Sequence, residues 1–310
     1  MARIDNPASI IPGQLKGLHL FHYDGAPCAQ RVRFALGEKG LHRGREVRFD
    51  DVSTAACAEN PGHWVSRVVS LAKKDHMTAT YAAIHPNMVV PALVHDGVLY
   101  LESLDIIRYL DETFGGPRLI PAERGLFDAT MARVEQAKVL HRSIRFVTFH
   151  WGLGRLATLN SKERQQLTAL AMNGDDGEKL VEFYEGYSTG GIPESTYVNH
   201  LRQLNAAFDD LDRELGDGRK FIMSDDVTIA DAFWSMKVLR LIECGYPFAE
   251  YHPRVLAWFE RVRARPSFQH EVMGKNRAMH RMFRAKAGVE NLMGIGLKRA
   301  VASHCAQRAA

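Results

Sequence analysis

Over the first third of the chain, short apolar runs typical of strands alternate with segments whose apolar residues have helical spacing. Leu18–His22 is apolar and β-prone. The loop after it contains Pro27, which suits a first helical position, and the predicted helix stops at Gly40, which suits a C-terminal cap. Arg45–Asp50 is a second predicted strand. This order of strand, helix and strand predicts an α/β domain.

Two more strands and a helix follow with no spare residues between them. Ala92–Val94 and Val98–Leu101 are apolar, and Asp96-Gly97 between them favours a tight hairpin because Gly adopts positive φ at little cost. Helical spacing then covers Leu104, Ile107 and Leu110. Together with the first strands, these elements fit a thioredoxin-like domain over residues 17–112.

The start of the last of these helices predicts a site for a carboxylate. Ser103 stands where an N-cap belongs, and Asp105 lies in the first turn, where its charge suits the helix dipole. Free N–H groups beside a hydroxyl bind carboxylates. Pro91 opens a strand that is otherwise buried, which is unusual because Pro cannot donate to a ladder. A cis bond after Val90 would leave the Val90 backbone free to pair with an extended ligand.

The second part of the chain is predicted to be all-helical. Glycines and prolines crowd a linker at 113–124, and helical spacing dominates residues 125–274. The first helix is expected to start at Leu126 and to reach Trp151 with a break, and Tyr197–Leu215 is strongly amphipathic. Thr228 and Asp231 form a capping-box pattern. Residues 1–16 are predicted to be a short leader.

The segment 51–84 is longer than one helix and a loop require. The valines that follow Pro61–Trp64 suggest an extra helix in this insertion. Loops are predicted at Asn173–Gly177 and Ser188–Pro193. Residues 275–310 form a basic tail with apolar residues among its bases.

Composition and charge exclude several classes of function. The chain has 310 residues, 46% of them hydrophobic, and no apolar run long enough to cross a membrane. The N-terminus lacks the apolar core of a signal peptide, so we expect a cytoplasmic protein. The four scattered cysteines make a metal site or a disulfide framework an unlikely role: Cys28, Cys57, Cys244 and Cys305.

The net charge of +4 comes from the tail. Residues 275–310 hold eight Lys or Arg and one acid, a balance of +7, so the remaining chain carries −3. This distribution does not indicate a nucleic-acid partner. A basic helix of this kind is most often a solvated, partly packed face. The alternatives are that the tail covers a ligand-binding cleft, contacts a partner subunit or, least favoured, lies on an anionic membrane.

Residues 89–110 resemble the glutathione-binding half of the glutathione S-transferase family. The Val-Pro at 90–91, the Asp-Gly hairpin and the Glu-Ser at 102–103 match that family's pattern in order and spacing. Residues 85–91 resemble its Asn-Pro-x-Gly-x-Val-Pro, with departures at His85 and Met88. The resemblance implies that Glu102 and Ser103 bind the γ-glutamyl carboxylate and amine of glutathione. The Val90 backbone would then pair with its cysteinyl part, and Pro91 would fix that geometry.

The group that activates the glutathione thiol stays open. Leu18 to Gly40 contains no Ser or Thr, so Tyr23 and Cys28 are the candidates. Gln30–Arg33 resembles the zeta-like class and places Cys28 on its active-site cysteine. An omega-like alignment instead puts Ala26 on the catalytic cysteine and disfavours a thiol reductase. Backbone N–H groups at residues 27–29 would be a further way to stabilise a thiolate.

The resemblance also implies an acceptor site in the helical domain. The aromatic segment Phe149, His150 and Trp151 is expected near the cleft, with core packing as the alternative. The resemblance further implies a homodimer, and residues 51–84 would then be a surface insertion or a wall of the cleft. The aromatic segment 145–152 and the helical insertion at 160–200 resemble the bacterial dehalogenase-like and β-etherase branches.

The function expected from the sequence is attack by glutathione thiolate on a small hydrophobic electrophile. The preferred reaction is β-aryl ether cleavage, followed by dehalogenation. A glutathione-dependent cis–trans isomerase is one alternative, supported by the zeta-like placement of Cys28. A non-catalytic interaction protein is another, supported by the missing Ser and Thr.

Overall fold

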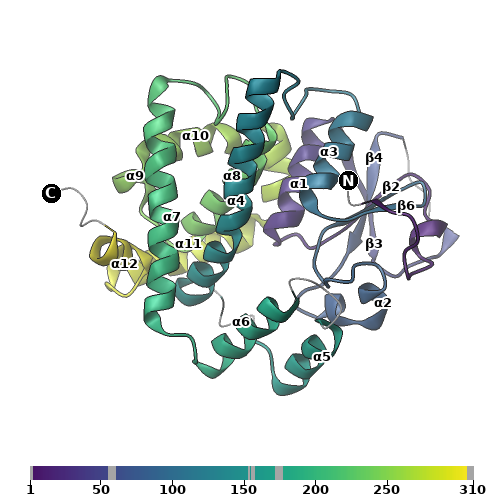
Figure 1. Cartoon of the computed structure of the whole chain (residues 1–310), viewed down its shortest axis with the longest axis horizontal. Helices are drawn as coiled ribbons and strands as arrows, with labels where there is room; N and C mark the ends of the chain where they lie inside the picture. The colour runs from purple at the N-terminus through teal and green to yellow at the C-terminus, as the bar shows by residue number, and fades with distance from the viewer. Residues whose placement is uncertain (1–2, 55–60, 153, 155–157, 172–176, 306–310) are drawn as a thin grey trace. The chain divides into compact units, whose positions relative to one another are not determined.

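The computed structural model describes residues 3–54, 61–152, 154, 158–171 and 177–305 (Figure 1). Contacts divide the chain into two compact units. Unit 1 consists of Met1–Pro117 and Leu159–Gly191, and unit 2 of Arg118–Thr158 and Ile192–Ala310. The predicted helical domain, 125–274, is therefore split, because residues 159–191 pack with the N-terminal part of the chain.

Unit 1 is built on a mixed sheet of six described strands, in the order β1-β6-β5-β2-β4-β3. The strands are β1 (Arg3–Ile4), β2 (Leu18–His22), β3 (His42–Arg48), β4 (His63–Val68), β5 (Ala92–His95) and β6 (Val98–Tyr100). The pairs β2–β4 and β3–β4 are parallel, and the others are antiparallel. Every residue of β2 is buried, as expected for a central strand covered on both faces.

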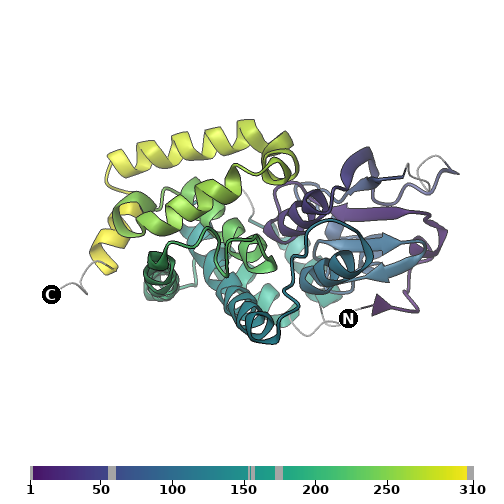
Figure 2. The same cartoon turned by 90° about the horizontal axis from the view of Figure 1, so that it is seen from above.

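Helices and short turns complete the sheet domain of unit 1. They are η1 (Pro12–Gln14), α1 (Pro27–Glu38), η3 (Asp75–Met77), α2 (Ala79–Ala82) and α3 (Ser103–Thr113). Helices α1 and α3 contact each other and lie side by side against the sheet (Figures 1 and 2). The thioredoxin-like class predicted from the sequence is confirmed.

The predicted helix in the 51–84 insertion was wrong. His63–Val68 is strand β4, which lies between β2 and β3. Four consecutive residues of it, Trp64 to Arg67, are buried, so the strand shows no alternation of apolar and polar positions. Its valine spacing therefore fitted a helix as well as a strand. Residues 55–60 of the insertion lie outside the described residues.

The predicted leader joins the fold. Strand β1 pairs antiparallel with β6, and Ile11 and Leu15 are buried in the core of unit 1. The second strand, β3, begins at His42, three residues before its predicted start. The predicted hairpin is confirmed, because Asp96 and Gly97 both have positive φ, at 47° and 85°.

A helical hairpin from the middle of the chain packs on unit 1. It consists of α5 (Ser161–Ala171) and α6 (Gly177–Thr189), so the predicted loop at Ser188–Pro193 begins two residues late, and residues 173–176 of the other loop lie outside the described residues. Leu159 and Leu167 form a buried cluster with Met77 and Met88. This apolar contact explains why residues 159–191 belong to unit 1.

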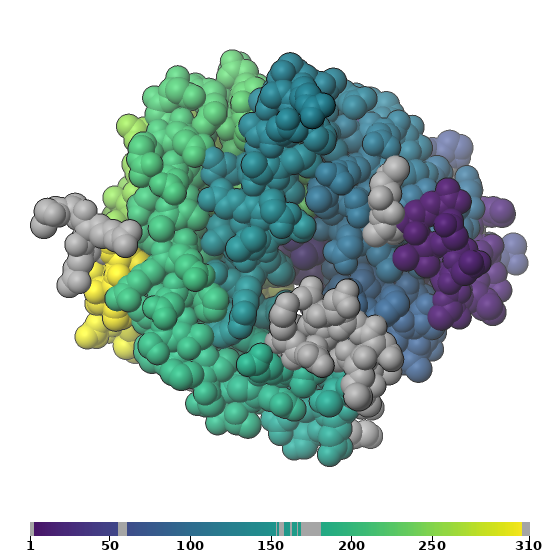
Figure 3. Space-filling view, viewed as in Figure 1, coloured from purple at the N-terminus to yellow at the C-terminus, as the bar shows by residue number. Residues whose placement is uncertain are grey.

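Unit 2 is a helical bundle. It contains α4 (Arg124–Trp151), α7 (Glu194–Glu214), η5 (Leu215–Asp217), α8 (Ile229–Glu243), α9 (Phe248–Tyr251), α10 (Pro253–Arg263), η6 (Phe268–Met273), η7 (Gly274–Asn276), α11 (Arg277–Leu292) and α12 (Leu297–His304). Helices α4 and α7 pack together along one face (Figure 3), and α4 also packs on α8. Helix α4 runs to Trp151 without the predicted break.

The capping box predicted at Thr228 and Asp231 is confirmed at the start of α8. The buried Asp231 carboxylate accepts from the backbone N–H groups of Ile222, at 3.0 Å, and Thr228, at 2.8 Å. It also accepts from the Thr228 hydroxyl at 3.1 Å and from the Trp258 indole at 2.7 Å. One carboxylate thus connects the loop before α8, the first turn of α8 and helix α10.

Candidate functional site

Three predicted site segments meet at one edge of the sheet. Strand β2 ends where β5 begins, since Phe21 pairs with Ala92. Strand β6 runs back antiparallel to β5 and ends near the same edge, since Leu93 pairs with Tyr100. The loop after β2, the residues before β5 and the start of α3 therefore share this edge.

Core packing joins the same three segments. A single buried cluster contains Ala26 and Ala29 from the start of α1, Val90 from before β5, and Leu101 from the end of β6. Tyr23 packs against this cluster and is only partly buried. The structure thus brings together the surroundings of all six predicted residues of unit 1.

Helix α1 begins this site with uncapped backbone donors. Its N-cap, Ala26, supplies no side-chain hydrogen bond, and Pro27 occupies the first turn. Cys28 is half-buried there, and the buried Arg31 donates from Nη2 to Cys28 Sγ at 2.9 Å. A helix N-terminus and a guanidinium both favour negative charge, so this position suits an anionic sulfur.

Two arginines, the buried Arg33 and the half-buried Arg43, fix the loop that carries Tyr23. Arg33 donates to the backbone carbonyls of Tyr23, at 3.3 Å, and Asp24, at 2.9 Å. Arg43 donates to the Asp24 carboxylate at 2.7 Å. Burial opposes ionisation of Asp24, but these hydrogen bonds from Arg43 and the charge of Arg33 outweigh it and lower the pKa of Asp24 to about 2.

The N-cap of helix α3 lies one residue earlier in the chain than predicted. Glu102 is the N-cap and Ser103 the first helical residue, so the expectation that Ser103 is the N-cap was wrong. Glu102 is exposed and has φ 62° and ψ 119°, a conformation that non-Gly residues rarely adopt. Such residues cluster at ligand sites, where the surrounding structure holds them. The chain thus turns at Glu102 from the end of β6 into the first turn of α3, which begins at Ser103.

The segment before β5 has the predicted cis Val90–Pro91 bond. Val90 is buried, whereas its neighbour Val89 is 38% exposed. The Tyr81 hydroxyl donates to the Val89 carbonyl at 2.8 Å and so holds this segment from the α2 side. Val90 and Pro91 thus lie directly before β5, at the sheet edge described above.

The predicted acceptor residues lie at the C-terminal end of α4, in unit 2. Phe149, His150 and Trp151 are all half-buried. The His150 ring stacks on Tyr197, with 4.1 Å between ring centroids, and contacts Trp151 edge-on at 4.5 Å. His150 also lies 3.6 Å from the Glu194 carboxylate. His150, Trp151 and Tyr197 thus form an aromatic group. The role of Phe149, His150 and Trp151 in an acceptor pocket stays a prediction.

Three features of this site were not predicted from the sequence. In the sequence, Arg31 was used only as part of the likeness to the zeta-like class. An arginine one helical turn after Cys28 could also have been recognised as a donor to its thiol. The support of Asp24 by Arg33 and Arg43 depends on contacts between segments far apart in the sequence. Met88 has φ 51°, which explains why the resembling family has Gly at this place.

The described residues contain neither a cluster suited to a metal ion nor a helix suited to a membrane span. No group of three or more His, Cys, Asp or Glu able to hold a metal ion was found among them. Over the same residues, no helix is long and apolar enough to cross a membrane. Of the remaining cysteines, Cys244 is buried and Cys305 half-buried, while Cys57 lies outside the described residues.

Comparison of the sequence with known families gives two matches. Residues 20–118 match the glutathione S-transferase N-terminal domain, and residues 166–261 match the glutathione S-transferase C-terminal domain. The 2,5-dichlorohydroquinone reductive dechlorinase of Sphingobium indicum is 25% identical over 290 residues, covering 82% of each chain. Glutathione S-transferase Z1 of Arabidopsis thaliana is 33% identical over 106 residues, which is 34% of this chain and 38% of that protein.

Solved structures show the same fold. The β-etherase LigF of Sphingobium sp. strain SYK-6 superposes with a TM-score of 0.66 at 18% identity, covering 82% of this chain and 98% of LigF. A bacterial zeta-class maleyl pyruvate isomerase superposes with a TM-score of 0.56 at 18% identity, covering 83% of this chain and 98% of that protein. With both domain matches in chain order, this chain belongs to the glutathione S-transferase family of enzymes.

Proposed function

We propose that this enzyme uses glutathione thiolate to displace a leaving group from a small hydrophobic electrophile. The observation that carries the proposal is the shared sheet edge, where the Cys28–Arg31 pair meets Val90 and the Glu102–Ser103 turn. In the proposed complex, Glu102, Ser103 and the α3 N-terminus hold the γ-glutamyl end of glutathione. The Val90 backbone pairs with its cysteinyl part.

The thiolate in this proposal lies at the start of α1. Backbone N–H groups of the first turn, the Cys28 thiol and the Arg31 guanidinium would donate toward the sulfur and stabilise its charge. Holding the acceptor carbon beside that sulfur supplies the proximity part of the rate. Tyr23 is the second candidate donor, because its side chain is only partly buried beside the same cluster.

The specific reaction we propose is β-aryl ether cleavage. The C–S bond forms as the C–O bond breaks, the electron pair leaves on the aryloxide oxygen, and that oxygen takes a proton from solvent. The likeness to LigF supports this choice at the level of the fold. We place the acceptor beside Phe149, His150 and Trp151, whose rings offer an apolar and aromatic surface.

Cys28 and the sequence relatives favour dehalogenation as the second candidate. Reductive removal of chloride consumes two glutathione molecules and yields the reduced arene, glutathione disulfide, chloride and a proton. A protein thiol beside the glutathione sulfur can carry a mixed disulfide in such a sequence of steps. Cys28 is that thiol here, and two dichlorohydroquinone dechlorinases match over 82% of this chain.

Product analysis tests these reactions. With a β-aryl ether whose leaving group is a coloured phenol, we expect a glutathione adduct by mass spectrometry and one equivalent of released phenol. C28A should slow this displacement without abolishing it, but should abolish reduction of 2,5-dichlorohydroquinone. Release of neither phenol nor chloride by an enzyme that binds glutathione would refute displacement, and a product of unchanged mass would indicate the isomerase instead.

Glutathione binding is tested separately. Loss of one hydrogen bond to a charged group weakens binding by about tenfold. We therefore expect S103A to be eluted from immobilised glutathione by about tenfold less free glutathione than the unchanged enzyme. S53A, which removes the same hydroxyl from an exposed loop position, is the matched control. Equal retention of both variants would remove Ser103 from the site. Sedimentation at several concentrations tests the proposed homodimer.

A further inference from the structure

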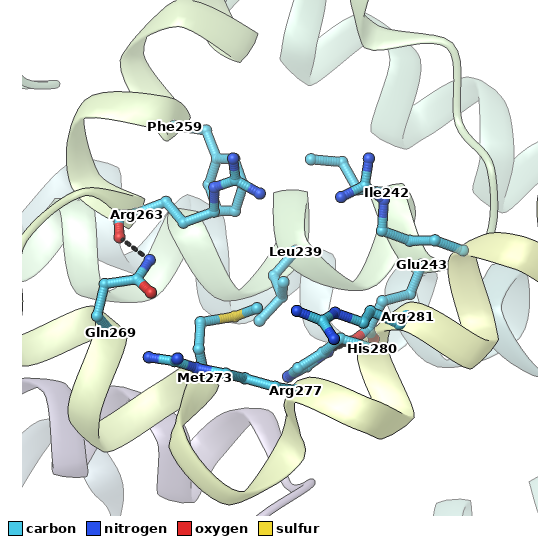
Figure 4. A pocket seen from close by; sticks show the side chains of 11 residues that line it. Leu239, Ile242, Glu243, Phe259, Arg263, Gln269, Met273, Arg277, His280 and Arg281 are labelled. Carbon is cyan, nitrogen blue, oxygen red and sulfur yellow. Dashed lines mark hydrogen bonds and ion pairs between the residues drawn. The ribbon is translucent and has the colours of Figure 1, made fainter.

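Unit 2 contains a pocket that the proposed function does not use. Its cavity of about 320 Å³ lies between α8, α10, the η6–η7 segment and α11 (Figure 4). The apolar part of the lining comes from Leu239, Ile242, Phe259 and Met273. This volume lies at the lower end of the range for small-molecule sites.

Four arginines also line this pocket, which we call the arginine pocket: Arg263, Arg277, Arg281 and Arg284. Three of them follow the spacing i, i+4, i+7 on α11, so they share one face of that helix. Arg263 comes from α10, and Figure 4 shows Arg263 and Arg281 on different sides of Leu239. The basic tail noted in the sequence therefore delivers three charges to one cavity.

Three of these charges lack a carboxylate partner within the described part of the chain. Arg263 pairs with Glu260 at 2.5 Å, whereas no ion pair between described residues includes Arg277, Arg281 or Arg284. Exposed side chains at this spacing usually alternate in sign, because like charges at i, i+4 repel. Three exposed arginines beside a concave and partly apolar surface form a place where a bound anion would be favoured.

The acidic and titratable groups facing the pocket do not supply that compensation. Glu243 lines the pocket, but its carboxylate contacts both Arg240, at 3.2 Å, and His280. His280 is buried, and burial together with the charge of Arg240 lowers its pKa to about 4. Lys286 and Glu290, farther along α11, pair with each other. The pocket lining therefore carries a net positive charge at neutral pH.

Backbone electrostatics act in the same direction. Arg277 stands in the first turn of α11, and that turn contains no acidic residue. Its N-cap, Asn276, does not cap the helix through a side-chain hydrogen bond. A cation at a helix N-terminus is unfavourable because the first N–H groups carry partial positive charge. A bound anion would satisfy both the arginines and the helix dipole.

We propose that the arginine pocket binds a small aromatic anion that carries two or more negative charges close together, as a phosphate ester or a dicarboxylate does. Guanidinium groups match phosphate and carboxylate oxygens in bidentate geometry. The apolar lining, with the Phe259 ring and the Met273 thioether, takes the aromatic body. All the lining residues belong to unit 2, so this site is separate from the glutathione-binding edge of unit 1.

Titration calorimetry on the full chain tests this proposal with phenyl phosphate and phthalate as probes. We expect saturable binding of at least one of the two dianions. Benzyl alcohol, which lacks the charge, and inorganic phosphate, which lacks the ring, should bind about tenfold or more weakly than that dianion. Binding should persist in saturating glutathione, and which dianion binds tighter identifies the anionic group.

Substitutions locate the site. R281Q and R277Q should each weaken binding of the dianion by about tenfold, the effect of one charged hydrogen-bonding group. R299Q removes the same charge from exposed α12 of the same tail and should leave binding unchanged. Equal urea midpoints for the three variants would show that they are equally folded.

Four outcomes would overturn the proposal. They are absence of saturable binding of both dianions, equal binding of the neutral or the ring-free probe, equal weakening by R299Q, and displacement of the dianion by glutathione. The last would place the anion at the glutathione-binding edge. None of these results depends on turnover, so failure here leaves the proposed function untouched.

Discussion

Replacement of Asp231 by Ala is the sharpest test of how unit 2 is held together. The carboxylate accepts four hydrogen bonds, from Ile222, Thr228 twice and Trp258, at 2.7 to 3.1 Å. The residue is fully buried. Removing it leaves three fixed donors without an acceptor, namely two backbone N–H groups and the indole N–H, whereas the Thr228 hydroxyl can rotate to another partner.

The expected cost follows from these three donors. A buried donor left without an acceptor costs about 1–3 kcal/mol, so D231A should lower the free energy of unfolding by at least about 3 kcal/mol. T228A removes one capping hydroxyl and should cost about 1 kcal/mol. The control D225A removes an exposed carboxylate that accepts from the Lys220 N–H at 3.0 Å, and it should cost about 0.5 kcal/mol or less.

Urea unfolding followed by far-UV circular dichroism measures these differences. Because the two units can unfold separately, amide exchange by mass spectrometry should accompany it and report on α8 and α10. We expect faster exchange in both helices of D231A, since the carboxylate links them. A cost for D231A no greater than for D225A, with unchanged exchange in α10, would refute the view that Asp231 joins these elements.

Two further predictions concern unit 1. Burial lowers the pKa of His85 to about 4, below its unfolded value of about 6.5, so the unfolded chain binds more protons between these values and stability falls as the pH drops through this window, by about 3 kcal/mol at most. In H85N, the free energy of unfolding should therefore fall less between pH 6.5 and pH 4 than in the unchanged protein. If urea unfolding at several pH values gave the same pH dependence for both proteins, the prediction would be contradicted. M88G relieves a positive φ but removes a buried side chain from the contact with Leu167, so we expect a net loss of about 1–3 kcal/mol. Faster amide exchange over α5 and α6 would localise that loss, whereas a more stable M88G would show that backbone strain outweighs the contact.

Several local elements could be predicted from the sequence because their signals are short-range. The Asp96-Gly97 turn, the start of α3 near Ser103 and the Thr228–Asp231 box each depend on residues within a few positions of one another. Turn and cap chemistry fixes such structures with little help from the rest of the chain. Family motifs in the same stretch then indicated glutathione.

Other features depended on the tertiary structure. Strand β4 is buried on both faces, so its pattern could not distinguish it from a helix, and only its pairing with β2 and β3 decides it. The α5–α6 hairpin joins unit 1 through Met88, and the arginine pocket forms where α11 meets α10. Contacts between residues far apart in sequence leave no periodic signal along the chain. Strand pairing and hydrophobic burial between distant segments therefore set these features only once the chain has folded.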